Sequence, residues 1–152
     1  MNTVVYDIET LSNLFLYYDE DAKSEESHTF VIHESRNDFK KLLAYLLNTK
    51  PAQIGFNVLS FDAQVIQWML DNQFRLLTLD GDACAREIYK YSQYVIGKQD
   101  RNEFVDYPEW KLKLPQLDLF KIWHYDNRAK MTGLKWIQFS IDWPNLQEMP
   151  LE

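Results

Sequence analysis

The spacing of apolar positions predicts that the chain opens with β-strands. Residues 4–10 are mostly apolar, with Asp7 and Glu9 one residue apart, which is typical of a strand with one buried face. Residues 14–18 and 29–33 are apolar runs rich in aromatic and β-branched side chains, and the charged stretch 19–27 between them predicts a hairpin turn or loop. Together these elements predict an antiparallel meander of three strands.

A helical period follows the meander. Ser35 is a good N-cap, with Asp38 at the third helical position. The apolar stripe predicted for this helix consists of Phe39, Leu42, Leu43, Leu46 and Leu47. Residues 48–51 end the helix, and residues 52–56 predict a strand that runs parallel to the first one, because a helical crossover joins the two.

The rest of the chain is mainly helical in pattern. In chain order it predicts a loop at 57–60, helices at 61–72 and 81–96, a long polar excursion with room for a hairpin at 97–113, a strand at 114–120 and a short helix at 132–139. Antiparallel strands followed by strands joined through helices predict an α/β architecture, with a mixed β-sheet flanked by helices.

Composition limits the class of protein. With 152 residues, 46% of them apolar and 15% aromatic, the chain suits a single globular domain over 1–152. No apolar run approaches the ~20 residues of a membrane-spanning helix, and the N-terminus does not resemble a signal peptide. The single cysteine, Cys84, excludes an internal disulfide. We therefore expect an intracellular, cytoplasmic protein in a reducing environment, with no membrane partner.

Charge is distributed unevenly along the chain. The formal net charge of −7 argues against a passive nucleic-acid binder, which is usually basic. Acidic residues dominate positions 1–34, whereas the following bases dominate positions 111–135: Lys111, Lys113, Lys121, Arg128, Lys130 and Lys135. This polarity suits a cation site at one edge and a phosphate-contacting strip at another, although two ordinary solvated faces explain it as well.

The first strand carries the clearest candidate chemistry. Alternation places Asp7 and Glu9 on the same face of the strand. Two neighbouring carboxylates repel each other and resist burial, so they indicate either an edge strand with solvated acids or a site for Mg²⁺ or Mn²⁺. Asn57 and Asp62 follow the end of the predicted parallel strand, which is the edge where α/β sheets gather their ligand sites.

These stretches resemble the DEDD exonuclease superfamily, which has the ribonuclease-H-like fold, and most closely the proofreading domains of family B DNA polymerases and their phage-encoded relatives. Tyr-Asp-Ile-Glu-Thr at 6–10 is similar to the first exonuclease motif, and Asn-x-x-x-Phe-Asp at 57–62 is similar to the second. Leu-Asp-Leu-Phe at 117–120 and Gly-Leu-Lys at 133–135 resemble the elements between the second and third motifs. The resemblance implies a ribonuclease-H-like mixed sheet.

The resemblance also implies a reaction and its metal ligands. Two divalent cations, Mg²⁺ or Mn²⁺, would clamp the scissile phosphate of a single-stranded DNA 3′ end. Asp7 would bridge both ions, Glu9 would hold one ion and help to position the nucleophile, and Asp62 would bind the second ion directly or through water. The implied activity is 3′→5′ exonucleolytic hydrolysis.

Candidate substrate-binding residues lie beside these acids. By the resemblance, Thr10 and Leu11 would meet the terminal sugar or base, and Asn57 would fix its loop or contact the terminal nucleotide. Phe61 is a further candidate, which is explained more simply as a core anchor than as a base-stacking side chain. The basic strip adds Lys111, Lys113 and Lys130 as candidate phosphate contacts.

The family's third motif, Tyr-x-x-x-Asp or His-x-x-x-x-Asp on a later helix, does not occur in the C-terminal third of the sequence. Asp118 is the best local substitute for the fourth carboxylate, ahead of Asp126 and Asp142. We therefore expect either an N-terminal portion of a larger exonuclease, a short form that binds without cutting, or a form completed by a partner chain. The alternative to an enzyme is a nucleic-acid- or protein-binding module on the same fold.

Overall fold

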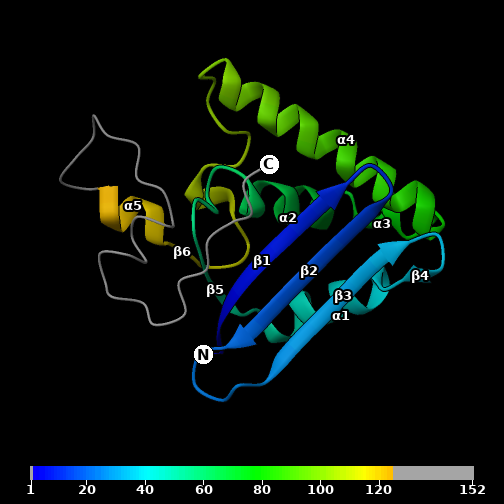
Figure 1. Ribbon diagram of the computed structural model, residues 1–152, viewed down its shortest axis with the longest axis horizontal. Coiled ribbons are helices and arrows are strands. Elements are labelled where there is room, and N and C mark those ends of the chain that lie inside the picture. Colours follow the sequence, from blue (N-terminus) through cyan, green and yellow to red (C-terminus); the bar gives the residue numbers. More distant parts are fainter. Residues whose placement is uncertain (1, 125–152) are drawn as a thin grey trace, which may run out of the picture.

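The computed structural model describes residues 2–124 (Figure 1). Its elements, in chain order, are β1 (Thr3–Leu11), β2 (Leu14–Asp21), β3 (Ser27–His33), β4 (Arg36–Asn37), α1 (Phe39–Thr49), β5 (Ala52–Gly55), α2 (Asp62–Asp71), α3 (Gln73–Leu76), α4 (Gly81–Asp100), the 3₁₀ turn η1 (Glu109–Lys111), β6 (Gln116–Asp118) and α5 (Leu119–His124).

The strands form one six-stranded mixed sheet in the order β4-β3-β2-β1-β5-β6. The pairs from β4 to β1 are antiparallel, whereas β1 with β5 and β5 with β6 are parallel. The predicted meander, the parallel strand after the first helix and the mixed α/β class are all confirmed.

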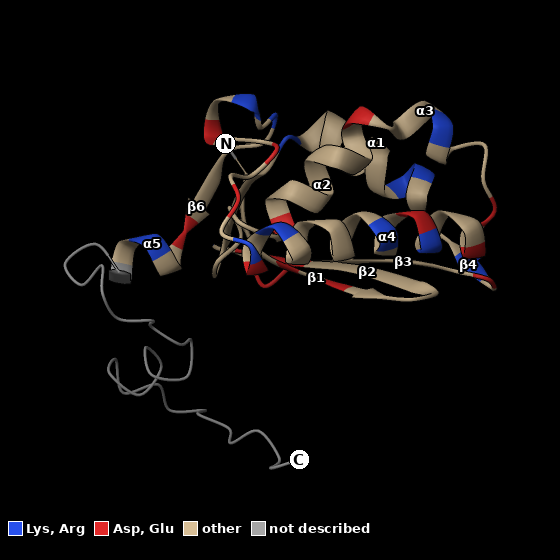
Figure 2. Ribbon diagram, turned by 90° about the horizontal axis from the view of Figure 1, so that it is seen from above, with Lys and Arg blue, Asp and Glu red and all other residues tan. Residues whose placement is uncertain are grey.

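One face of the sheet carries three of the helices. Figure 2 shows α1, α2 and α4 on the same side of β1, β2 and β3. Val4, Tyr6 and Ile8 are buried in this layer, whereas Asp7 and Glu9 are exposed, so the predicted alternation of β1 is confirmed. Within residues 2–124, no helix combines the length and the apolar character that crossing a bilayer requires.

The predicted loop at 19–27 is partly wrong, because β2 continues through Asp21. The reason is Asp19, whose side chain is fully buried. It accepts hydrogen bonds from the Tyr17 hydroxyl at 2.8 Å and the Tyr45 hydroxyl at 2.5 Å, and it lies 2.8 Å from Nδ1 of His28. A buried carboxylate needs such partners, and only the folded sheet supplies them.

The predicted N-cap at Ser35 is also wrong. The chain forms the short strand β4 there, and α1 begins only at Phe39, with Asp38 at the N-cap position. The Asp38 carboxylate accepts hydrogen bonds from Val31 N at 3.0 Å and Arg36 Nε at 2.7 Å instead of capping the helix. The predicted apolar stripe of α1 is confirmed.

The later elements differ from the prediction mainly in length. The short helix α3 was not predicted, and α4 extends to Asp100 rather than ending near residue 96. Residues 101–115 contain the short 3₁₀ turn η1 and form no hairpin. The last strand covers only Gln116–Asp118, because α5 starts at the next residue. The helix predicted at 132–139 lies outside the described residues.

We predict that Gly81→Ala destabilises the protein by about 1–3 kcal/mol. Gly81 begins α4, and a Cβ there would collide with the carbonyl oxygen of His33, which belongs to β3 and cannot move aside. Gly97→Ala is the matched control on the same helix, because its Cβ would meet only the Arg101 side chain, at 3.1 Å. Urea unfolding should show Gly97→Ala near wild type or slightly more stable, and equal effects of the two variants would contradict this packing.

Candidate functional site

Two carboxylates from distant parts of the sequence meet beside β1. The parallel pairing of β1 with β5 runs from Thr3 to Val5, so β1 continues beyond that point without β5 beside it. Asp62, the first residue of α2, fills the gap: its Oδ2 accepts a hydrogen bond from Ile8 N at 3.3 Å. The Asp62 side chain thus lies next to Asp7, at the carboxyl end of β5.

The pair is electrostatically unfavourable without a counterion. Burial raises the pKa of Asp62, which is only 8% exposed, and the neighbouring Asp7 charge raises it further, to about 7. The hydrogen bond from Ile8 N opposes this shift. Partial burial of its carboxyl also raises the pKa of Asp7. The pair therefore favours either a proton or a cation near neutral pH.

Asp7 and Asp62 form the pair, and Asp118 is near enough for its charge also to raise the pKa of Asp62. Glu9 lies on the same face of β1 as Asp7 and is exposed. In the part of the chain that the structure describes, no three His, Cys, Asp or Glu side chains form a metal-binding group. A pair still fits Mg²⁺, which keeps several waters and is usually held by one or two carboxylates together with substrate phosphates.

Asp118 has a structural role that the sequence did not indicate. Its Oδ1 accepts hydrogen bonds from Asn57 N at 2.8 Å and Phe120 N at 3.0 Å, and its Oδ2 accepts one from Leu59 N at 3.0 Å. These bonds engage both carboxylate oxygens of a side chain that is itself buried. Asp118 thereby joins β6 to the loop that delivers Asp62, whereas Asp126 and Asp142 lie outside the described residues.

The candidate substrate residues lie in two places, the loop after β5 and the end of β1. Asn57 has a left-handed backbone with φ of 56°, and its Oδ1 accepts a hydrogen bond from Ser60 Oγ at 2.7 Å. Phe61 is half-buried and packs against the core, as expected for an anchor. Thr10 is half-buried and Leu11 is exposed at the end of β1. Asn57 therefore has a structural role, because its backbone and side chain set the conformation of its loop.

Of the candidate phosphate-contacting lysines that the structure describes, Lys113 does not lie at the carboxylate pair. Lys113 Nζ lies 3.7 Å from the Asp71 carboxylate. Asp71 ends the helix that Asp62 begins, and the rise of α2 separates these two residues by about 14 Å. Lys111 is exposed on η1, and Lys130 lies outside the described residues. Lys113 therefore lies near the C-terminal end of α2, away from Asp62.

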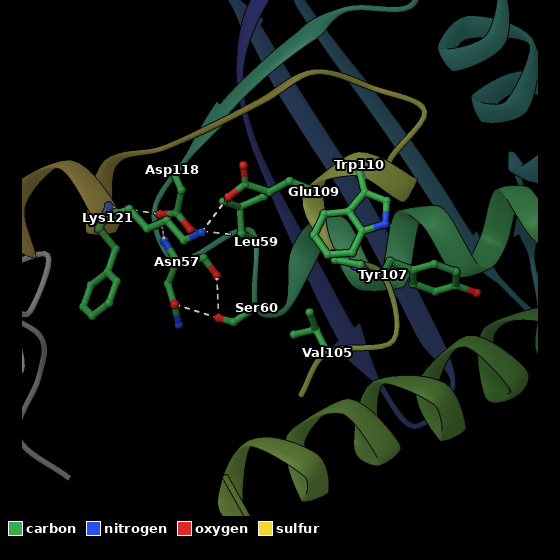
Figure 3. A pocket seen from close by; sticks show the side chains of 11 residues that line it. Asn57, Leu59, Ser60, Val105, Tyr107, Glu109, Trp110, Asp118 and Lys121 are labelled. Carbon is green, nitrogen blue, oxygen red and sulfur yellow. Dashed lines mark hydrogen bonds and ion pairs between the residues drawn. The ribbon is translucent and has the colours of Figure 1, made fainter. Parts of the chain in front are cut away.

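A pocket beside the Asn57 loop was not predicted from the sequence. It has a volume of about 560 Å³ and lies between this loop, η1 and the start of α5 (Figure 3). Tyr107 and Trp110 line one side, and Asn57 and Asp118 line the other. The aromatic side chains of the polar excursion at 97–113 were the available signal, but no periodic pattern marked them as a wall.

The structure thus brings Asp7 and Asp62 together, uses Asp118 to hold the loop between them and the pocket, and places Lys113 elsewhere. No family model, no curated protein and no solved structure matches this chain.

We predict that Asp62→Asn removes a pH-dependent loss of stability. The folded state raises the Asp62 pKa from its ordinary 3.8 to about 7. The contribution of this carboxyl to the stability in EDTA should therefore be greatest below pH 4 and fall as the pH rises to 7, by on the order of 2–4 kcal/mol. The neutral Asn side chain has no such loss and can still accept the Ile8 N–H.

Thermal unfolding in EDTA between pH 4 and 8 measures this effect. The melting temperature of Asp62→Asn should exceed that of the wild type by an amount that grows with pH and levels off above pH 7. A difference that stays constant across this range would show that the Asp62 carboxyl is not perturbed by burial and by Asp7.

Proposed function

We propose that the chain is a metal-dependent 3′→5′ exonuclease domain that acts on single-stranded DNA ends. The observation that carries this proposal is the Asp7–Asp62 pair, which places two carboxyls with raised pKa values at the carboxyl end of a parallel strand. Clusters of perturbed carboxyls at this edge of a sheet are typical of functional sites. The phage-type proofreading exonucleases that the sequence resembles use acids from these same two motifs.

The sheet supports the finer assignment of a ribonuclease-H-like fold. Three antiparallel strands come first, and two parallel strands then extend the sheet beyond β1. The first motif lies on the central strand β1, and the second motif opens α2. This arrangement lets acids about fifty residues apart in the sequence share one site.

The roles of the residues follow from their environments. Asp7 and Asp62 would hold Mg²⁺ or Mn²⁺, and Glu9, on the same exposed face, would help to orient the attacking water. A bound cation would supply charge stabilisation at the phosphate and a more acidic water. Protonation of Asp62 near pH 7 competes with the cation, so activity should fall as the pH drops below 7. A second ion would need a further carboxylate.

A catalytically incomplete binding module is the second candidate. The observation that favours it is the pair itself: residues 2–124 bring together two carboxylates where the resembled family uses four. A module of this kind would bind nucleic acid or protein, or would receive its missing ligand from a further segment or a partner chain.

We predict that Mn²⁺ supports shortening of a 5′-labelled single-stranded DNA from its 3′ end, giving a ladder on a denaturing gel. Asp7→Asn should reduce the rate at least about 100-fold, because even residues that only support a metal ligand cost 10–100-fold. Glu25→Gln is the matched control, since this exposed acid lies in the turn between β2 and β3. Its rate should equal that of the wild type.

Each outcome selects one candidate. A ladder that requires Mn²⁺ and is lost in Asp7→Asn supports the exonuclease. No ladder from the wild-type protein, or an equal ladder from Asp7→Asn, would contradict the exonuclease proposal and leave the binding module.

A further inference from the structure

We infer that the pocket beside the Asn57 loop binds an unpaired base of a single-stranded nucleic acid. This inference deepens the proposed function and rests on it for the choice of ligand. The pocket has the mixed lining that a base requires: the aromatic side chains of Trp110 and Phe120, the polar side chains of Asn57 and Ser60, and a cation on Lys121. Its volume, about 560 Å³, is within the usual range for small-ligand pockets.

Trp110 provides the stacking surface. Its side chain is 84% exposed on η1 even though it is the largest apolar side chain at the pocket. An exposed indole offers a flat π-face to any base, and stacking of this kind is one of the two sources of affinity in single-strand binders, together with charge. Phe120 lies on another wall, where its ring packs edge-on against Phe56 at 5.6 Å.

The wall that carries Trp110 is fixed before any ligand binds. Gln64, a buried residue of α2, donates from Nε2 to the Tyr107 carbonyl at 2.8 Å, and its Oε1 accepts from Tyr107 N at 2.9 Å. The same Nε2 donates to the Leu59 carbonyl at 2.9 Å on the opposite side of the pocket. One side chain thus ties both walls together, which lowers the ordering cost of binding.

The loop that lines the pocket leads directly into Asp62, the first residue of α2. Ser60 lines the pocket, and Asp62 follows two residues later, so their Cα atoms are at most about 7 Å apart. This spacing is close to one nucleotide step of an extended strand. We therefore expect a strand with one base in the pocket to be able to reach Asp62 with a neighbouring phosphate.

Electrostatics limits the contribution of phosphate contacts. Lys121 Nζ forms an ion pair with Glu109 Oε1 at 2.6 Å, and both side chains are exposed at the pocket. Lys121 must therefore exchange Glu109 for a phosphate, while the net charge of −7 opposes any polyanion. Stacking rather than charge should dominate, and the dependence of log K on log salt should have a slope near that of one contact, about −0.7.

A stacking pocket discriminates between strands. The faces of bases in a duplex are covered by their neighbours, so only an unpaired base can enter against Trp110. DNA and RNA share this base chemistry, and the 2′-hydroxyl distinguishes them. The ligand class is thus single-stranded nucleic acid, with matched DNA and RNA oligonucleotides telling the two sources apart.

Fluorescence anisotropy with 5′-fluorescein-labelled single strands, in EDTA, tests the pocket without the cation site. Trp110→Ala should weaken binding about tenfold, and Trp110→Phe should retain most of the affinity. Phe74→Ala is the matched control, because this aromatic side chain is 80% exposed on α3, at the other end of α2. Its affinity should equal that of the wild type.

The Lys121–Glu109 ion pair gives a second test with opposite signs. Glu109→Gln should strengthen binding, because it frees Lys121 and removes a negative charge, whereas Lys121→Gln should weaken it. Both variants break the same exposed ion pair, so a merely structural role would move the affinity in the same direction in both. Effects of equal sign would overturn the inference, as would undetectable binding by the wild-type protein, an unchanged affinity in Trp110→Ala or equal affinity for a blunt duplex.

The two proposals fail separately. If Trp110→Ala loses oligonucleotide binding but the wild-type protein does not digest DNA, the pocket proposal is retained and the exonuclease is rejected. Digestion that depends on Asp7, with oligonucleotide affinity unchanged in Trp110→Ala, would retain the exonuclease and reject the pocket.

Discussion

The carboxylate of Asp118 is the constraint on which the site depends. It ends the short strand β6 and accepts three backbone hydrogen bonds, two from the loop after β5 and one from the start of α5. The loop has a left-handed residue at Asn57 and would otherwise leave its N–H groups unsatisfied at a buried edge. By holding this loop, Asp118 fixes both the start of α2, where Asp62 lies, and one wall of the pocket.

A buried chain of hydrogen bonds fixes the strands that carry this loop. The Tyr6 hydroxyl donates to Gln116, Gln116 donates to Gln53, Gln53 donates to the Tyr17 hydroxyl, and Tyr17 donates to Asp19. These side-chain hydrogen bonds connect β1 with β6, β6 with β5, and β5 with β2. Because each buried polar group would be costly without its partner, a shift in strand register would break the chain at several points. Register at the functional edge is therefore specified by polar contacts as well as by apolar packing.

Local patterns in the sequence predicted the elements that bury apolar side chains. The alternation in β1, the stripe of α1 and the strand β5 were all evident because each follows a simple period. The patterns failed where polar side chains are buried. Asp19 is charged, which is typical of a loop, and Ser35 is a residue type that commonly caps helices. In both cases, partners from other elements decide the structure.

The candidate site was predictable to the extent that motifs are local. The first and second motifs identified Asp7 and Asp62, and strand topology explained why they should meet. Nothing local indicated that Asp118 would serve as a tie, or that Gln64 would fix Trp110 beside the Asn57 loop. These roles depend on contacts across more than forty positions of the chain, which no window of sequence contains.

The most direct test of the account is a calorimetric titration of the protein with Mn²⁺ at pH 7.5. A cation site at the Asp7–Asp62 pair predicts saturable binding that is lost in Asp7→Asn and in Asp62→Asn but is unchanged in Glu25→Gln. Protons should be released on binding, because Asp62 is partly protonated near pH 7. Binding that is equal in all four proteins, or no binding by the wild type, would contradict a cation site at the Asp7–Asp62 pair.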